Sequence, residues 1–186
     1  MPFPMPSSVN PRYHRISILL HWAMLLLIAA VYAAMELRDL FPKGSEGRDA
    51  MKEWHFMLGL LVFALVWIRL LARLLFSRPA ITPPPARWQQ QFAKLGHLAL
   101  YGLMIALPLL GWLLLSAGGK PIPFFGLSLP ALIPADNALK GSIKEWHETL
   151  ATLGYFLIGL HALAAIYHHH VLKDNTLTNM LPGKRS

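Results

Sequence analysis

The sequence contains no cysteine. This absence excludes disulfides, cysteine-ligated iron–sulfur clusters and covalently attached c-type haem, which requires a C-x-x-C-H motif. Charged residues are also scarce: they make up 14% of the 186 residues, whereas 55% are hydrophobic. This balance is too apolar for an ordinary soluble domain, and it predicts one integral membrane domain over residues 1–186.

The sequence also lacks a phosphate-binding glycine loop and any carboxylate inside its long apolar stretches. The second absence disfavours a divalent-metal transporter, because such proteins place carboxylates within the membrane. The formal net charge is +8. In a membrane protein an excess of basic residues reports topology, so we expect no nucleic-acid partner.

Four long apolar stretches separate polar links, and each is long enough to cross a hydrocarbon core of about 30 Å. We therefore predict an all-α membrane protein, a four-helix transmembrane bundle in contact with lipid. The spans are expected at about residues 16–36, 54–76, 93–116 and 145–171. The first run is too long for a cleaved signal peptide, and no small-residue cleavage site follows it. The proline-rich start, residues 1–11, is expected to be disordered.

The three links between the spans differ in composition. Residues 37–53 are polar and rich in turn formers, and they are expected to form a loop. Residues 77–91 contain four prolines and predict a stiff, non-helical connector. Residues 118–144 also contain four prolines but are apolar in their first half, so we expect this link to cover one end of the bundle as a cap.

Basic residues are unevenly divided between the two sides of the predicted bundle. Ten of the seventeen Lys and Arg lie on the side of both termini, and seven lie on the other side. The positive-inside rule therefore puts both termini in the cytoplasm.

Two histidines lie fourteen residues apart on the last apolar stretch, at His147 and His161. Fourteen residues are close to four helical turns, so both imidazoles point to nearly the same face and are separated by about 21 Å along the axis. Gly154 lies halfway between them and leaves room on this face for a flat ligand. Packed core histidines are the alternative, but an ionisable residue within a membrane indicates function.

The intramembrane histidines sort by depth into two levels. His55 and His147 lie near the periplasmic ends of their spans, whereas His21, His97 and His161 lie near the cytoplasmic ends. A b-type haem needs two axial donors at one level from two helices, and imidazole suits iron. The periplasmic level offers one pair, and the cytoplasmic level offers three candidates for two positions.

Several motifs resemble the bacterial cytochrome b561 family, and most closely its superoxide-oxidising members. They are Trp54-His55, Leu95-Gly-His97-Leu, Lys144-Glu-Trp-His147-Glu-Thr-Leu, Gly159-Leu-His161-Ala, and the tail from His168-His169 through Lys173-Asp-Asn-Thr-Leu. The resemblance implies a multi-pass protein of the bacterial inner membrane with two haem b groups. It assigns one haem to His55 and His147 and the other to His21 and His161, which leaves His97 free.

The same resemblance implies electron transfer from periplasmic superoxide to membrane ubiquinone, with release of oxygen. The last link contains three lysines, Lys120, Lys140 and Lys144, but a single acidic residue, Asp136. This is the only local excess of positive charge on the periplasmic side. These lysines could attract an anion such as superoxide, or they could only anchor the loop at the headgroups.

At the cytoplasmic level a quinone needs a hydrogen-bonding partner and a source of protons. His97, His168 and Arg73 are the candidates. Arg69 and Arg73 could also pair with haem propionates, or could be simple positive-inside anchors. His169 and His170 are interpreted as an interfacial cluster or an adventitious metal site.

Two other function classes remain open from the sequence. The chain could be a haem b anchor subunit that passes electrons between a partner dehydrogenase or hydrogenase and quinone. It could also be a structural membrane protein, which would contain no haem after purification.

Overall fold

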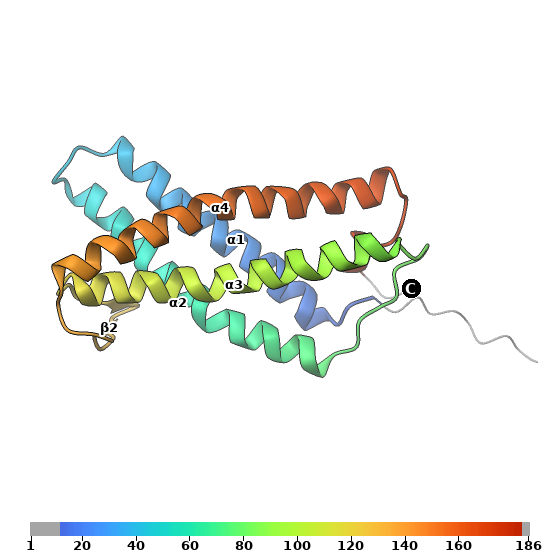
Figure 1. The fold of residues 1–186 in the computed structure, drawn as a ribbon, viewed down its shortest axis with the longest axis horizontal. Coiled ribbons are helices and arrows are strands. Elements are labelled where there is room, and N and C mark those ends of the chain that lie inside the picture. The colour runs from blue at the N-terminus through green and yellow to red at the C-terminus, as the bar shows by residue number, and fades with distance from the viewer. Residues whose placement is uncertain (1–11, 184–186) are drawn as a thin grey trace, which may run out of the picture.

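Four long helices make up most of the computed structural model, which describes residues 12–183. They are α1 (Arg15–Leu37), α2 (Glu46–Leu75), α3 (Arg87–Ala117) and α4 (Asn137–His170). All four are long and apolar enough to cross a membrane; α3 and α4 run along the long axis of the molecule, and α1 and α2 are inclined to it (Figure 1). The predicted all-α bundle of four spans is confirmed. The proline-rich start, together with Lys184 and Arg185 of the orientation count, lies outside the described residues.

The short elements distinguish the two ends of the bundle. A two-stranded antiparallel sheet, β1 (Pro123–Phe124) and β2 (Leu127–Ser128), pairs Pro123 with Ser128 at the end where α3 stops and α4 starts. We call this the hairpin end; it also holds the short helix η1 (Arg38–Leu40). The opposite end, where α1 begins and α4 stops, is called the terminal end, and η2 (Thr178–Met180) follows α4 there (Figure 1).

Helix α2 begins eight residues before the span expected at 54–76, so the prediction of a loop over residues 37–53 is wrong in its second half. Ser45 is the reason: its hydroxyl oxygen accepts a hydrogen bond from the backbone N–H of Arg48 at 3.3 Å. Such a cap supports a first turn that is polar, and hydropathy alone does not detect it.

The other two links are also shorter than expected. Helix α3 begins at Arg87, within the connector expected to be non-helical over 77–91. Helix α4 begins at Asn137, because a carboxylate oxygen of Asp136 accepts hydrogen bonds from two backbone N–H groups of the first turn, at 2.9 and 3.0 Å. The helices therefore extend beyond the hydrophobic spans.

The apolar link between α3 and α4 covers the hairpin end, as expected. Ile122 is only 2% exposed and packs with Leu60 of α2 and Leu115 of α3. The indole N–H of Trp112 donates to the carbonyl of Pro130 at 3.0 Å and fixes the link to α3. Many other large apolar side chains are exposed on the outside of the bundle, where the helices would meet lipid.

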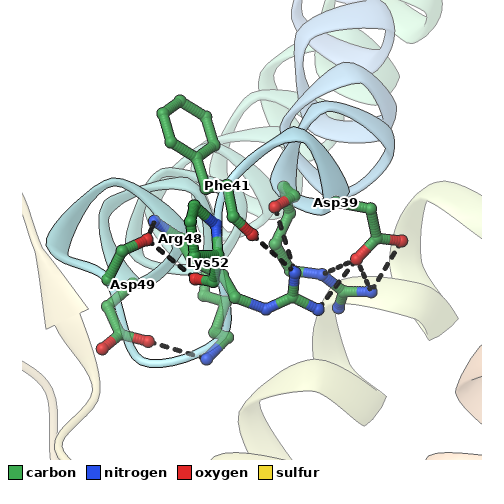
Figure 2. A network of polar contacts seen from close by, with 8 residues as sticks. Asp39, Phe41, Arg48, Asp49 and Lys52 are labelled. Atoms are coloured by element: carbon green, nitrogen blue, oxygen red, sulfur yellow. Dashed lines mark hydrogen bonds and ion pairs between the residues drawn. The ribbon is translucent and has the colours of Figure 1, made fainter.

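An ion-pair network fixes the turn between α1 and α2 (Figure 2). The Arg48 guanidinium lies 2.8 Å from a carboxylate oxygen of Asp39 and donates to the Phe41 carbonyl at 3.2 Å. Lys52 and Asp49 pair at 2.7 Å on the first turns of α2. These contacts set the start of α2, and with it the height of His55.

The helices pack unequally around the bundle. Close backbone packing joins α1 to α2, α2 to α3, and α3 to α4. Helices α1 and α4 instead meet through long side chains: the Tyr32 hydroxyl donates to the Ala151 carbonyl at 2.8 Å, and the Tyr155 hydroxyl donates to a Glu36 carboxylate oxygen at 2.7 Å. The side between α1 and α4 is therefore the more open one.

The segment after α4 folds back over the terminal end (Figure 1). The indole N–H of Trp22 in α1 donates to the Met180 carbonyl at 2.7 Å. The backbone N–H of Thr82, in the connector between α2 and α3, donates to the Asn175 side-chain oxygen at 2.8 Å. The C-terminal segment thus ties α1, the connector and α4 together.

Candidate functional site

At the hairpin end, His55 of α2 and His147 of α4 face each other. Their ring centroids are 6.1 Å apart, and the rings are inclined at 75°. The Nδ1 of His55 lies 3.0 Å from the carbonyl oxygen of Val31. Because a carbonyl only accepts, Nδ1 carries the proton, and the Nε2 lone pair of His55 is free to bind a metal.

In the described part of the chain, the ring of His147 lacks a hydrogen bond like the one that orients the ring of His55. Its Nδ1 is buried and makes no well-formed hydrogen bond among residues 12–183, although the backbone of Leu107 in α3 lies close to it. Gly111 of α3 lies against this ring, since a Cβ at that position would stand 3.5 Å from Cε1. The chain therefore fixes the ring of His147 less firmly than that of His55.

At the terminal end the structure brings together the three expected histidines. The ring centroids of His21 in α1 and His161 in α4 are 6.2 Å apart, with the rings inclined at 71°. His97 of α3 approaches the same His161 ring more closely, at 5.4 Å. The depth of these residues, as inferred from the sequence, did not decide which two of the three form the pair.

The ring separations of these pairs can be compared with the spacing of two imidazoles on one metal. A metal–imidazole nitrogen bond is about 2.0 Å long and an imidazole ring has a radius of about 1.15 Å, so two rings on opposite sides of one metal have centroids about 6.3 Å apart. The separations of His55–His147 and His21–His161, 6.1 and 6.2 Å, match this value, and that of His97–His161, 5.4 Å, is shorter.

Arg69 of α2 lies beside the terminal-end pair. Its Nη2 is 2.9 Å from Nδ1 of His21, and its Nε donates to the Tyr101 hydroxyl at 3.2 Å. Because a guanidinium only donates, Nδ1 of His21 accepts this hydrogen bond and Nε2 carries the proton, which is the tautomer opposite to that of His55. For His21 to bind a metal through Nε2, this nitrogen must lose its proton and Arg69 must release Nδ1. Arg69 Nη1 is buried with no partner in the described chain, so one donor remains available.

Arg73 lies one turn further along α2. Its guanidinium carbon is 5.5 Å from the centre of the Tyr101 ring. Sequence reasoning missed Tyr101, although it follows His97 by four residues and therefore shares a face of α3 with it. Tyr101 thus lies between two arginines and near His97.

Gly154 does not leave open space between the two levels, and that expectation is corrected. It is buried, and the Tyr32 hydroxyl oxygen lies too close to the Cβ position to leave space for a methyl group. The glycine lets α1 and α4 approach through Tyr32. Gly59, by contrast, has nothing within 4 Å of its Cβ position and does leave room beside His55.

His168 lies at the end of α4 and is paired with a residue that sequence reasoning missed. Its Nδ1 is 2.5 Å from a carboxylate oxygen of Asp174, which is only 5% exposed. Burial acts to raise the pKa of Asp174, but hydrogen bonds from His168 and from the Thr176 amide outweigh it and lower the pKa below its ordinary value. The rings of His169 and His170 lie 4.7 Å apart and are not part of this contact.

The three lysines singled out from the sequence lie at the hairpin end, and their surroundings differ. Lys144 lies 3.5 Å from a Glu148 carboxylate oxygen, one turn along α4. Lys120 and Lys140 form no ion pair within residues 12–183. The uncompensated positive charge of this group therefore comes from these two.

Comparison with known proteins points to the same family as the sequence motifs do. Residues 12–183 match the family described as prokaryotic cytochrome b561. The chain is 44% identical over 174 residues to cytochrome b561 homolog 1 of Escherichia coli K12, covering 94% of this chain and 99% of the relative.

Two further relatives are similar over almost their whole length. The probable superoxide oxidase CybB of Yersinia pestis is 39% identical over 177 residues, covering 95% of this chain and 99% of that protein. Cytochrome b561 homolog 2 of Escherichia coli K12 is 31% identical over 181 residues, covering 97% and 96%. The chain therefore belongs to the prokaryotic cytochrome b561 family and is a multi-pass bacterial membrane protein that binds haem b and transfers electrons.

Proposed function

We propose that this protein is a di-haem cytochrome b that transfers electrons from periplasmic superoxide to membrane ubiquinone and releases oxygen. The observation that carries the proposal is the presence of two imidazole pairs in one bundle, with centroids 6.1 and 6.2 Å apart. His55 and His147 would hold one haem, and His21 and His161 the other. When bound, the haems supply reversible one-electron storage at two depths of the membrane.

Helix α4 supplies one ligand to each level. The fourteen residues between His147 and His161 separate the two levels by about 21 Å along the helix, most of the way across a core of about 30 Å. With both termini in the cytoplasm of a bacterial inner membrane, the hairpin end faces the periplasm. Electrons would then enter at the hairpin-end pair and leave at the terminal-end pair.

The donor side is supported by one relative and by local charge. A related protein is named a probable superoxide oxidase, which favours superoxide as the donor here too. Ion pairs within the chain occupy Arg48 and Lys52 of the α1–α2 turn (Figure 2). Lys120 and Lys140, like Lys43 of that turn, form no ion pair within the described residues and could attract a small anion at short range, whereas Lys144 is partly neutralised by Glu148.

The acceptor side is assigned to the terminal end, where His97, His168 and Arg73 are the candidate quinone contacts. The Nδ1 of His97 lies 2.6 Å from the Ala93 carbonyl, so its Nε2 is left free to contact a ligand. Arg69 and Arg73 supply positive charge near the inner pair, which anionic haem propionates require.

The overall reaction balances with two donors for each acceptor. Two superoxide anions each lose one electron and become two molecules of oxygen. One quinone takes up the two electrons and two protons and becomes the quinol. The chain must therefore conduct electrons from the hairpin end and admit protons near the quinone.

Rapid mixing of the purified, haem-loaded protein with superoxide tests this function. We expect haem reduction followed by reoxidation when a short-chain ubiquinone is added. Haem that superoxide does not reduce, but that a co-purifying dehydrogenase or hydrogenase does, would contradict the proposal and favour the anchor-subunit function. The absence of haem after purification would contradict both.

A further inference from the structure

Four residues of α4 are spaced seven apart: His147, Gly154, His161 and His168. A helix turns by nearly two full turns in seven residues, so successive members stay on the same face to within about 20°. His168 therefore continues the face of His161, about 10.5 Å further toward the terminal end. It is the last histidine on the face that carries both proposed haem ligands.

His168 is held by a buried carboxylate from the C-terminal segment. One oxygen of Asp174 contacts His168 Nδ1 at 2.5 Å, and the other accepts from the backbone N–H of Thr176 at 2.9 Å. The backbone N–H of Asp174 in turn donates to the His168 carbonyl at 3.1 Å. A carboxylate in this position keeps the proton on Nδ1 of His168 and stabilises the ring when Nε2 also carries a proton.

Asp174 also borders a polar hollow at the terminal end. The hollow has a volume of about 350 Å³ and is lined by Thr82, His169, Lys173, Asp174, Asn175 and Thr178. Two hydrogen bonds between Thr82 and Asn175, at 2.8 and 3.2 Å, hold its walls together. A hollow with this lining has the polar partners that water needs. Asp174 thus lies between a hydratable hollow and His168.

We propose that Asp174 and His168 form the route by which protons reach quinone from the terminal end of the bundle. This inference rests on the proposed function, which assigns quinone reduction to that end. His168 is the catalytic residue: the bond from its Nε2 to hydrogen breaks, and a new O–H bond forms on the quinone as that oxygen gains an electron. Asp174 is the positioning residue: its carboxylate holds the proton on Nδ1, and water that reaches the ring from the hollow beside Asp174 returns a proton to Nε2. Two such transfers match the two electrons that form the quinol.

The route predicts an effect confined to one half of the reaction. In Asp174→Asn, reduction of haem by superoxide should keep its rate. Oxidation of pre-reduced haem by a short-chain ubiquinone should slow by about 100-fold, at the lower end of what general acid catalysis contributes. Asp174→Glu should restore most of the rate. A small weak acid such as formic acid should partly rescue Asp174→Asn, which a purely structural role of Asp174 does not predict.

His170→Gln is the matched control, because His170 is exposed near the end of the same helix and does not line the hollow. It should oxidise its haem at nearly the rate of the unchanged protein. The proposal is overturned if Asp174→Asn reacts with quinone at the normal rate, or if His170→Gln slows as much as Asp174→Asn does.

If Asp174→Asn does not retain haem, the same oxidation by ubiquinone is measured on His168→Gln. This variant keeps a polar side chain but cannot transfer a proton. A normal rate of oxidation by quinone in that variant would also overturn the proposal. Failure of the proposed function is distinguishable, because the unchanged protein would then fail to react with superoxide or with quinone.

Discussion

Replacing Gly154 with alanine should expose how α1 and α4 are joined. The added methyl group would clash with the Tyr32 hydroxyl, which donates to the Ala151 carbonyl at 2.8 Å. The tyrosine would have to move and would lose this hydrogen bond. Without the hydroxyl, the nearest atoms to the new methyl group would be a Tyr32 ring carbon at 3.6 Å and Leu103 Cδ1 at 3.7 Å, which are ordinary contacts.

These contacts give a magnitude for the change. Overpacking costs about 1–3 kcal/mol, and the lost hydrogen bond costs about 1 kcal/mol. Exchange of glycine for alanine within a helix stabilises the folded protein by about 1 kcal/mol. Gly154→Ala should therefore destabilise the protein by about 1–3 kcal/mol, but in a Tyr32→Phe background it should stabilise it by up to about 1 kcal/mol. The coupling free energy between the two positions is then at least about 2 kcal/mol.

A double-mutant cycle measures this coupling, using unfolding of the protein in mixed detergent micelles followed by circular dichroism. Gly159→Ala is the control, because a Cβ at Gly159 would meet nothing within 4 Å on the same helix. It should have the same effect with and without the Tyr32 hydroxyl. A coupling below about 0.5 kcal/mol for Gly154 would refute the interpretation that this glycine makes room for Tyr32.

Three further predictions concern the two ends of the bundle. The double variant Lys120→Gln, Lys140→Gln should reduce its haem more slowly with superoxide at 0.1 M salt but not at 1 M, since the Debye length falls from about 10 Å to about 3 Å. Lys144→Gln alone should have a smaller effect. If the double variant and the unchanged protein are reduced at equal rates at both salt concentrations, the lysines do not attract superoxide. The folded pKa of Asp174 lies below its ordinary 3.8, so its contribution to stability is present above pH 3.8 and is lost as the pH falls through the folded pKa. The difference in unfolding free energy between the unchanged protein and Asp174→Asn should accordingly be larger at pH 7 than at pH 3, and a constant difference would contradict this. Trp22→Phe should loosen the C-terminal segment by about 1 kcal/mol, because the indole hydrogen bond to it is lost; faster proteolysis of that segment, with intact helices, is the expected result.

The helices and the two levels of histidines could be predicted from the sequence. Long uncharged stretches define the spans, and the regular rise of a helix fixes the depth of each side chain along it. These two facts are enough to bring His55 level with His147, and the structure gives their rings a separation of 6.1 Å. They were not enough to choose between His21 and His97, because both are near the depth of His161.

The remaining features depend on contacts between segments that are distant in the sequence. Tyr32 lies 122 positions before Gly154, and no local pattern indicates that the hydroxyl of one fills the space beside the other. The pairing of His168 with Asp174 requires the chain to reverse after α4, which it does with Lys173 at a positive φ of 54°. The starts of α2 and α4 were missed because Ser45 and Asp136 act through hydrogen bonds rather than hydropathy.

The central claim is that His55 with His147, and His21 with His161, hold two haems at two depths. The measurement that tests it most directly is the ratio of haem to protein in single alanine variants, together with reduced-minus-oxidised spectra. Replacement of His55 or His147 should remove the same haem, replacement of His21 or His161 should remove the other, and His97→Ala should keep both. Loss of a haem in His97→Ala, with both retained in His21→Ala, would contradict the assignment.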